Sequence, residues 1–313
     1  MQLINGKPMP TLGLGTWKSR PGEVRFAVRE AIRAGCRHID CATIYGNEVE
    51  VGQGLADAMA DGVGRDELWI TSKLWNDAHA PADVRPALEA SLSKLGLEQL
   101  DLYLMHWPVA IRGNASFPLR AHDIFAPGAM PVATTWQAME ACVDAGLVRH
   151  VGVSNFSARK LQQLLDVARI APAMNQVELH PYLQQDALLR FCATHGVGVT
   201  AYSPLGSGDR PKGMKTAGEP VLLQDPVILA LADKHGASAA QILIAWALQR
   251  GTSVIPKSVN AGRIAQNLAA AKIVLDADDM RQLAALDCHR RYLDGADWVV
   301  DGGPFTQASL WDE

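Results

Sequence analysis

Cysteine is scarce in this chain, and its pattern excludes the structural roles that cysteine usually has. The 313 residues hold five cysteines, an odd number, and no two of them are spaced as Cys-x-x-Cys. This pattern argues against a disulfide framework and against a structural zinc site. Histidine and cysteine never cluster at ligand spacing, so we expect no metal site. Reduced thiols suit a reducing compartment, and we therefore expect a cytoplasmic location.

Long apolar runs and runs of like charge are also missing. No stretch reaches the roughly 18 apolar residues that a membrane span needs. The opening segment MQLINGKPMP has no apolar core, so we expect no secretory signal. Lysine and arginine number 29 against 33 acidic residues, a net charge of -4 without any basic stripe. We therefore expect neither a membrane nor a nucleic-acid partner, and any anion site must be built locally.

The sequence does contain a regular alternation of short apolar runs and amphipathic stretches, which is typical of βαβ units. Hydrophobic residues make up 48% of the chain, enough for a large core. The predicted strands are residues 11–15, 38–41, 68–72, 100–106, 150–154, 173–177, 198–202 and 253–256. The predicted helices are residues 24–34, 49–60, 82–95, 134–145, 158–168, 187–195, 239–249 and 263–271.

These elements predict a single (β/α)8 barrel domain over residues 1–313. The runs are apolar throughout, as buried parallel strands are, and eight right-handed repeats close a barrel readily. A doubly wound sheet is the rival, but no Gly-x-Gly-x-x-Gly follows the first strand. Asn5-Gly6 suits a type I′ turn, which predicts a β-hairpin before the barrel.

Three segments interrupt the alternation, namely residues 109–131, 206–225 and the C-terminal tail 287–313. Long loops are either functional or solvated connectors, and each segment taken alone allows both interpretations. Because all three follow or approach the carboxyl ends of strands, where barrel enzymes keep their active sites, we expect them to form walls of a substrate pocket.

Polar side chains at three consecutive strand ends suggest proton-transfer chemistry. Asp40 ends the second predicted strand with Tyr45 five residues later, Lys73 follows the third, and His106 ends the fourth. A lysine ammonium lowers the pKa of a nearby tyrosine, a carboxylate holds the lysine, and a histidine can orient a carbonyl oxygen. Each residue alone is more often structural, as an ion pair, wall packing or a core histidine. Together they could protonate a developing alkoxide, provided that a cofactor supplies hydride.

A candidate phosphate site follows the eighth predicted strand. Lys257 and Arg263 flank a helix start, and either Ser258 or Asn260 could cap it. Free N–H groups at a helix N-terminus and two cations suit a phosphate, and two cations near a ribose favour the 2′-phosphate of NADP. A capped surface helix with exposed charges is the alternative.

Three segments resemble the aldo-keto reductase family, in the right order and over essentially the whole chain. They are GCRHIDCATIYGNE at residues 35–48, LDLYLMHWP at 100–108, and IPKS through Asn267 at 255–267. The resemblance implies a (β/α)8 barrel that reduces an aldehyde or ketone with NADP(H), acting on a small-molecule substrate as a monomer. It makes Tyr45 the general acid, tuned by Lys73 and Asp40, with His106 orienting the carbonyl.

The resemblance also implies a set of cofactor contacts. Ser154, Asn155 and Gln176 would hold the carboxamide, with Tyr202 stacked on the nicotinamide ring. The pyrophosphate would lie beside Ser203, Leu205 and Asp209. The adenosine end would be held by Lys257, Ser258, Asn260, Arg263 and Asn267, although Gln266 stands where relatives often carry Glu. Thr16 and Trp17 would lie near cofactor and substrate.

Tryptophans at the strand ends are candidates for an apolar substrate pocket. Trp17, Trp75 and Trp107 follow three predicted strands, and Trp298 lies in the tail, where packing against the barrel rim is the alternative. His106 favours carbonyl chemistry, because relatives that reduce carbon–carbon double bonds carry Glu there. Two other functions stay open, a cofactor-binding barrel without turnover and an isomerase or lyase that binds a sugar phosphate. The sequence leaves the substrate, direction and stereochemistry undetermined.

Overall fold

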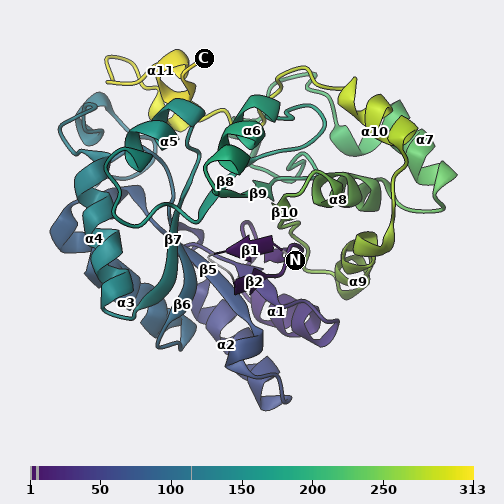
Figure 1. Ribbon diagram of the computed structural model, residues 1–313, viewed down its shortest axis with the longest axis horizontal. Helices are drawn as coiled ribbons and strands as arrows, with labels where there is room; N and C mark the ends of the chain where they lie inside the picture. The colour runs from purple at the N-terminus through teal and green to yellow at the C-terminus, as the bar shows by residue number, and fades with distance from the viewer. Residues whose placement is uncertain (1, 5–6, 114) are drawn as a thin grey trace.

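A ring of parallel strands surrounded by helices forms the body of the molecule (Figure 1). The computed structural model describes residues 2–4, 7–113 and 115–313. Within them an eight-stranded sheet runs in sequence order. Its strands are β3 (Leu14–Gly15), β4 (His38–Asp40), β5 (Trp69–Leu74), β6 (Leu100–Met105), β7 (Val148–Ser154), β8 (Met174–Glu178), β9 (Gly198–Tyr202) and β10 (Ser253–Val254). Each of the eight predicted strands is therefore found.

The first and last strands pair and close the sheet into a barrel. Parallel bridges join Leu12 to Val254 and Gly15 to Lys257. Gly15 permits this approach, because a Cβ atom there would lie 2.8 Å from the carbonyl oxygen of Ile255. The predicted (β/α)8 barrel is thus confirmed. Since single bridges make this seam, β3 and β10 are shorter than the predicted runs.

Helices cover the outside of the barrel, as predicted. They are α1 (Val24–Arg33), α2 (Glu48–Ala60), α3 (Pro81–Leu95), α4 (Val132–Asp144), α5 (Ala158–Leu165), α6 (Asp186–Thr194), α8 (Ala239–Gln249) and α9 (Ala261–Ala269). Three helices were not predicted, namely α7 (Pro226–Lys234), α10 (Ala277–Ala284) and α11 (Gln307–Trp311). Side-chain caps at Asp225, Asp276 and Thr306 start these three short helices.

The predicted hairpin covers the amino-terminal end of the barrel. Strands β1 (Gln2–Ile4) and β2 (Lys7–Met9) pair antiparallel, and Figure 1 shows them across the middle of the ring. The predicted turn, Asn5-Gly6, lies outside the described residues. Met9 is fully buried in a cluster with Trp69 and Leu102, so it seals this end of the barrel. Among the described helices none alone could cross a membrane; α7 and α8 reach that length and apolarity only as a pair bent by 90°.

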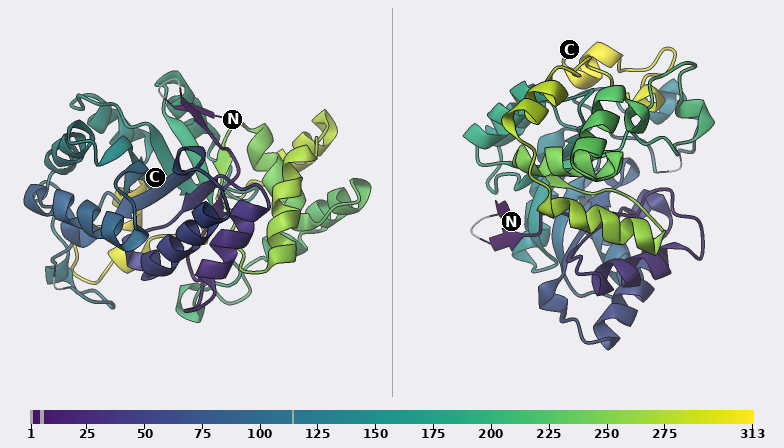
Figure 2. Two further views of the ribbon diagram at one scale, coloured as in Figure 1. Left: turned by 90° about the horizontal axis from the view of Figure 1, so that it is seen from below. Right: turned by 90° about the vertical axis from the view of Figure 1, so that its right-hand side faces the viewer.

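The tail and the loop after β6 pack together beyond the carboxyl ends of the strands. A separate buried cluster joins Val109, Ile111 and Ile124 of that loop to Trp298, Phe305 and Leu310 of the tail. The views in Figure 2 show the tail, in yellow, folded back over the barrel to the carboxyl terminus. Neither segment is a solvated connector, because both bury apolar side chains against each other.

Candidate active site

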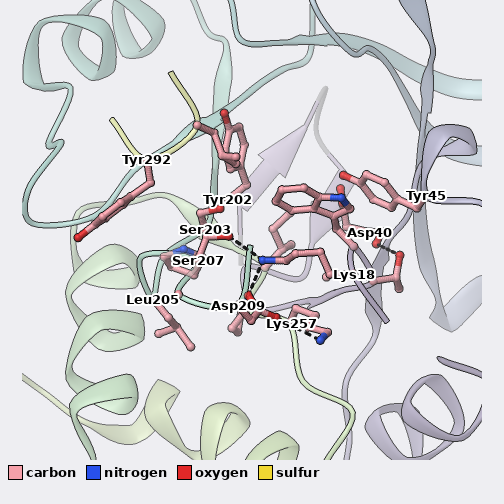
Figure 3. Close-up of a pocket in the computed structure, with 18 of the residues that line it drawn as sticks. Lys18, Asp40, Tyr45, Tyr202, Ser203, Leu205, Ser207, Asp209, Lys257 and Tyr292 are labelled. Atoms are coloured by element: carbon pink, nitrogen blue, oxygen red, sulfur yellow. Dashed lines mark hydrogen bonds and ion pairs between the residues drawn. The ribbon is translucent and has the colours of Figure 1, made fainter. Parts of the chain in front are cut away.

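A cavity of about 960 Å³ opens where the strands end. Its lining comes from the turns after β3, β4, β5, β6, β7, β9 and β10, from Gln176 within β8, and from the tail. Every site residue predicted from the sequence lines it, except Lys73, which is fully buried beneath Tyr45. Figure 3 shows several of these side chains converging on the cavity. The barrel topology brings them together from positions spread over most of the chain.

A buried ion pair lies under the tyrosine hydroxyl. The Nζ atom of Lys73, on β5, is 2.5 Å from Oδ1 of Asp40 and 3.4 Å from the hydroxyl oxygen of Tyr45. Lys73 also donates to the carbonyl oxygen of Cys41 at 3.0 Å, and Gln176 donates to Oδ2 of Asp40 at 2.6 Å. Burial alone would lower the pKa of Lys73, but the interactions with Asp40 and its other neighbours together outweigh burial and raise that pKa, so the ammonium stays charged.

The expected lowering of the Tyr45 pKa is wrong as a net effect. Burial raises the pKa of Tyr45 to about 12, although Lys73 pulls it down. Desolvation of the phenolate exceeds the attraction of an ammonium that Asp40 already partly neutralises. Tyr45 therefore holds its proton at neutral pH, and Lys73 lies where it could stabilise a phenolate at this position.

His106 stands beside Tyr45 as a neutral imidazole. Burial, with the charge of Lys73, puts the pKa of His106 well below its ordinary value. Its ring lies 5.9 Å from the Tyr45 ring and 5.1 Å from that of Trp75, centroid to centroid. Because Nδ1 is buried, Nε2 is the ring nitrogen that can reach the cavity. An N–H there can donate to a carbonyl oxygen held next to the tyrosine hydroxyl.

An amide-rich wall extends from His106 along one side of the cavity. Asn155 has a positive φ of 64°, donates to the carbonyl oxygen of His106 at 3.0 Å, and accepts from the hydroxyl of Tyr202 at 2.7 Å. Ser154 donates to the carbonyl oxygen of Gln176 at 2.8 Å. These bonds fix the orientation of the Tyr202 ring and of two side-chain amides. A planar ring that carries a carboxamide fits such a wall, where Tyr202 offers a face for stacking.

A loop over residues 203–225 lines the cavity; we name it the cofactor loop, because the family resemblance implies that it lies beside the pyrophosphate. Asp209 in this loop lies 2.5 Å from Nζ of Lys18 and 3.4 Å from Nζ of Lys257, so it joins the turns after β3 and β10 (Figure 3). Lys18 also bonds the hydroxyl of Ser207 at 2.6 Å. Lys18 was not predicted from the sequence. A lysine two residues after Thr16 has no distinctive sequence pattern, because its role depends on Asp209, which lies 191 residues away.

The residues of the predicted anion site lie together at the start of α9. Asn260 is the N-cap and accepts from the backbone N–H of Arg263 at 3.0 Å, which decides between the two candidate caps. Among the described residues, the exposed Arg263 guanidinium has no ion-pair partner, so it is free for a ligand. Asn267 is buried one turn further on. An unpaired guanidinium at a helix N-terminus fits a phosphate.

Aromatic rings line the other side of the cavity. Trp298 is 2% exposed, and its ring lies 5.8 Å from that of Trp75 and 5.5 Å from that of Trp107. Phe117, which the sequence analysis missed, joins them at 5.8 Å from Trp298. Trp17 lies 6.4 Å from Tyr45. Trp298 packs against the rim and also lines the cavity, so both interpretations of this residue hold.

The described part of the chain has no group of three His, Cys, Asp or Glu side chains that could hold a metal ion.

Comparison with known proteins gives one consistent result. The sequence model of the Aldo/keto reductase family matches residues 11–287. The chain is 55% identical to the aldo/keto reductase slr0942 of Synechocystis sp., covering 99% of this chain and 95% of that one. It is 50% identical to human aldo-keto reductase family 1 member A1, covering 93% and 90%. An aldose reductase structure from Schistosoma japonicum superposes with a TM-score of 0.86 at 37% identity, covering 95% of each chain.

The family match covers all eight strands of the barrel and includes the residues at their carboxyl ends. The segments that resembled the family in the sequence, residues 35–48, 100–108 and 255–267, all lie within the matched range. The chain therefore belongs to the aldo/keto reductase family, whose members generally reduce carbonyl groups with a nicotinamide cofactor.

Proposed function

We propose that this chain reduces an aldehyde or ketone to an alcohol with NADPH, and that Tyr45 donates the proton. The observation that carries the proposal is the chain of contacts from Asp40 through Lys73 to Tyr45 at the floor of the cavity. It supplies a protonated hydroxyl beside a fixed cation. NADPH, when bound, supplies the hydride that adds to the carbonyl carbon.

The residues of the site then complete the reaction. His106 donates a hydrogen bond to the carbonyl oxygen and orients it toward Tyr45. As negative charge develops on that oxygen, Tyr45 gives up its proton and the product is an alcohol. The Lys73 ammonium, 3.4 Å away, stabilises the tyrosinate until solvent returns a proton. Asp40 keeps Lys73 charged and in place.

The proposed cofactor contacts follow the cavity from the floor to α9. Ser154, Asn155 and Gln176 would hold the carboxamide beside Tyr202. The cofactor loop, held by the bonds of Asp209 to two lysines, would close over the pyrophosphate. Arg263 and Lys257 would take the 2′-phosphate, which favours NADPH over NADH. The fit rests on the unpaired Arg263 guanidinium and on the amide-rich wall.

The proposed substrate side is the aromatic wall of Trp17, Trp75, Trp107 and Trp298. A wall of this kind suits aromatic or aliphatic aldehydes over heavily hydroxylated ones, because polar groups would lose water there without new partners.

The test is turnover of a substrate panel, followed by the loss of NADPH absorbance. An aromatic aldehyde, a dicarbonyl, an aldose and a ketone are each run with NADPH and with NADH. We expect the aromatic aldehyde to react fastest and NADPH to be preferred. The matched variant is Tyr45→Phe, which removes the proton donor and keeps the ring. It should bind NADPH normally and lose nearly all turnover, and unchanged turnover would remove the proposed role of Tyr45.

A further inference from the structure

Tyr292 lies where the cofactor loop and the tail meet. It is 4% exposed and comes directly before residues 293–298, which line the cavity and include Trp298. In Figure 3 its side chain extends beside the cofactor loop, on the far side of Tyr202 from Tyr45. Its backbone belongs to the wall of the substrate side, and its side chain contacts the cofactor loop.

The backbone of Tyr292 is bound to the barrel through a buried carboxylate. Glu178, the last residue of β8, accepts from the N–H groups of Tyr292 at 2.7 Å and Leu293 at 2.8 Å. The same carboxylate lies 2.8 Å from Nε2 of His180. Burial would raise the pKa of Glu178, but His180 and the two N–H groups bring it below its ordinary value, so Glu178 stays ionised. The start of the tail wall is therefore fixed to a core strand.

The side chain of Tyr292 is bound to the cofactor loop. Its hydroxyl donates to the carbonyl oxygen of Pro220 at 2.8 Å, and the Arg210 guanidinium lies 4.9 Å from its ring centroid. At Gly206 a Cβ atom would lie 3.3 Å from the Tyr292 ring, so the loop backbone packs directly against that ring.

A shared carboxylate strengthens the same junction. Glu219 of the cofactor loop pairs with Arg210 of that loop and lies 3.3 Å from Arg290 of the tail. The cofactor loop and the tail thus meet through an ion pair, a hydrogen bond and ring packing. On the tail side, these contacts come from Tyr292 and from Arg290, two residues before it.

We propose that Tyr292 is a positioning residue that couples the cofactor loop to the substrate wall. The inference rests on the proposed function, in which NADPH lies beneath the cofactor loop. Closure of that loop over the cofactor holds Pro220 and Arg210 against Tyr292. Residues 293–298, which follow Tyr292 directly, are thereby held in the conformation that shapes the substrate side. Cofactor binding orders the wall against which the substrate will pack, although no atom of the wall need touch the cofactor.

The test is amide hydrogen exchange with and without saturating NADPH, in the wild type and in Tyr292→Phe. This variant removes the bond to Pro220 and keeps the ring. In the wild type, NADPH should slow exchange both in residues 203–225 and in residues 290–298. In Tyr292→Phe, NADPH should still slow exchange in the cofactor loop. The slowing of exchange in residues 290–298 should be smaller than in the wild type by roughly two- to tenfold, the factor that one neutral hydrogen bond supplies.

A matched control and a second variant sharpen the result. Tyr103→Phe removes another buried tyrosine hydroxyl, one without a partner in the described structure, and should behave as wild type. Glu219→Gln neutralises the carboxylate shared by Arg210 and Arg290 and should lose part of the tail slowing, as Tyr292→Phe does. In turnover, both junction variants should raise KM for a bulky aromatic aldehyde by a similar factor.

The outcomes separate this inference from the proposed function. Equal tail slowing in the wild type and in both junction variants overturns the role of Tyr292. Slowing of the cofactor loop without any tail slowing in the wild type overturns the coupling itself. If neither segment slows, a fluorescence titration with NADPH decides between the two: binding without slowing overturns this inference alone, whereas no binding removes the proposed function and this inference with it.

Discussion

Replacing Lys73 with Met removes the ammonium beneath Tyr45 while nearly preserving side-chain length. The ammonium lies 3.4 Å from the tyrosine oxygen. At an effective dielectric constant of about 20, two unit charges at this distance interact by about 5 kcal/mol. The proposed transition state places negative charge on Tyr45, so this attraction is lost from the barrier. We expect the rate of the chemical step to fall by about three to four orders of magnitude.

The assay must separate this loss from damage to the fold. Lys73→Met leaves Asp40 buried without its cation, which destabilises a protein by about 3–5 kcal/mol. The double variant Lys73→Met with Asp40→Asn removes both charges, so it should recover much of the thermal stability and none of the rate. Single-turnover reduction at saturating NADPH measures the chemical step, and thermal melting measures stability. A single-turnover rate within tenfold of wild type for Lys73→Met would refute the assigned role.

Three further predictions test other parts of the molecule. Arg263→Ala should weaken NADPH binding by roughly tenfold or more and leave NADH binding nearly unaffected, because a hydrogen bond to a charged group contributes about 1.5–3 kcal/mol. A fluorescence titration that shows NADPH and NADH binding weakened equally would reject the 2′-phosphate assignment. Asp209→Asn should speed NADP+ release in stopped-flow measurements, because it weakens the bond to Lys18 that holds the cofactor loop; an unchanged release rate would show that the loop does not retain the cofactor. Stability should fall as the pH drops from 7 to 5, because burial lowers the pKa of His38 and of His79 from 6.5 to about 4. In this pH range the unfolded chain binds protons that the folded chain does not, which lowers the free energy of unfolding by about 2 kcal/mol for each histidine. In urea unfolding, His79→Gln should lose less stability between pH 7 and pH 5 than the wild type does.

The strand ends of the barrel could be predicted because local signals and topology agree there. Apolar runs locate the strands, and a polar residue at or next to the carboxyl end of a run must lie at the same rim once the barrel closes. Asp40, Lys73, His106 and Gln176 follow this rule, and the structure brings all four within one network around Tyr45. The sign of the Tyr45 pKa shift could not be predicted. It depends on how much wall surrounds the hydroxyl, and the wall comes from loops with no periodic pattern.

The residues that the sequence did not reveal share one property, which is that their partners lie far along the chain in irregular segments. Lys18 meets Asp209 across 191 residues, and Tyr292 meets Glu178 across 114. A cation in a turn or a tyrosine in a tail has no local pattern that distinguishes it from a surface residue, since its meaning comes from loop packing after the barrel has formed. The same reasoning explains where substrate choice resides. In the proposed function, the barrel rim fixes the proton donor, the cofactor-facing wall and the anion site, whereas the tail and the cofactor loop, joined at Tyr292, would set the shape of the space that remains for a substrate.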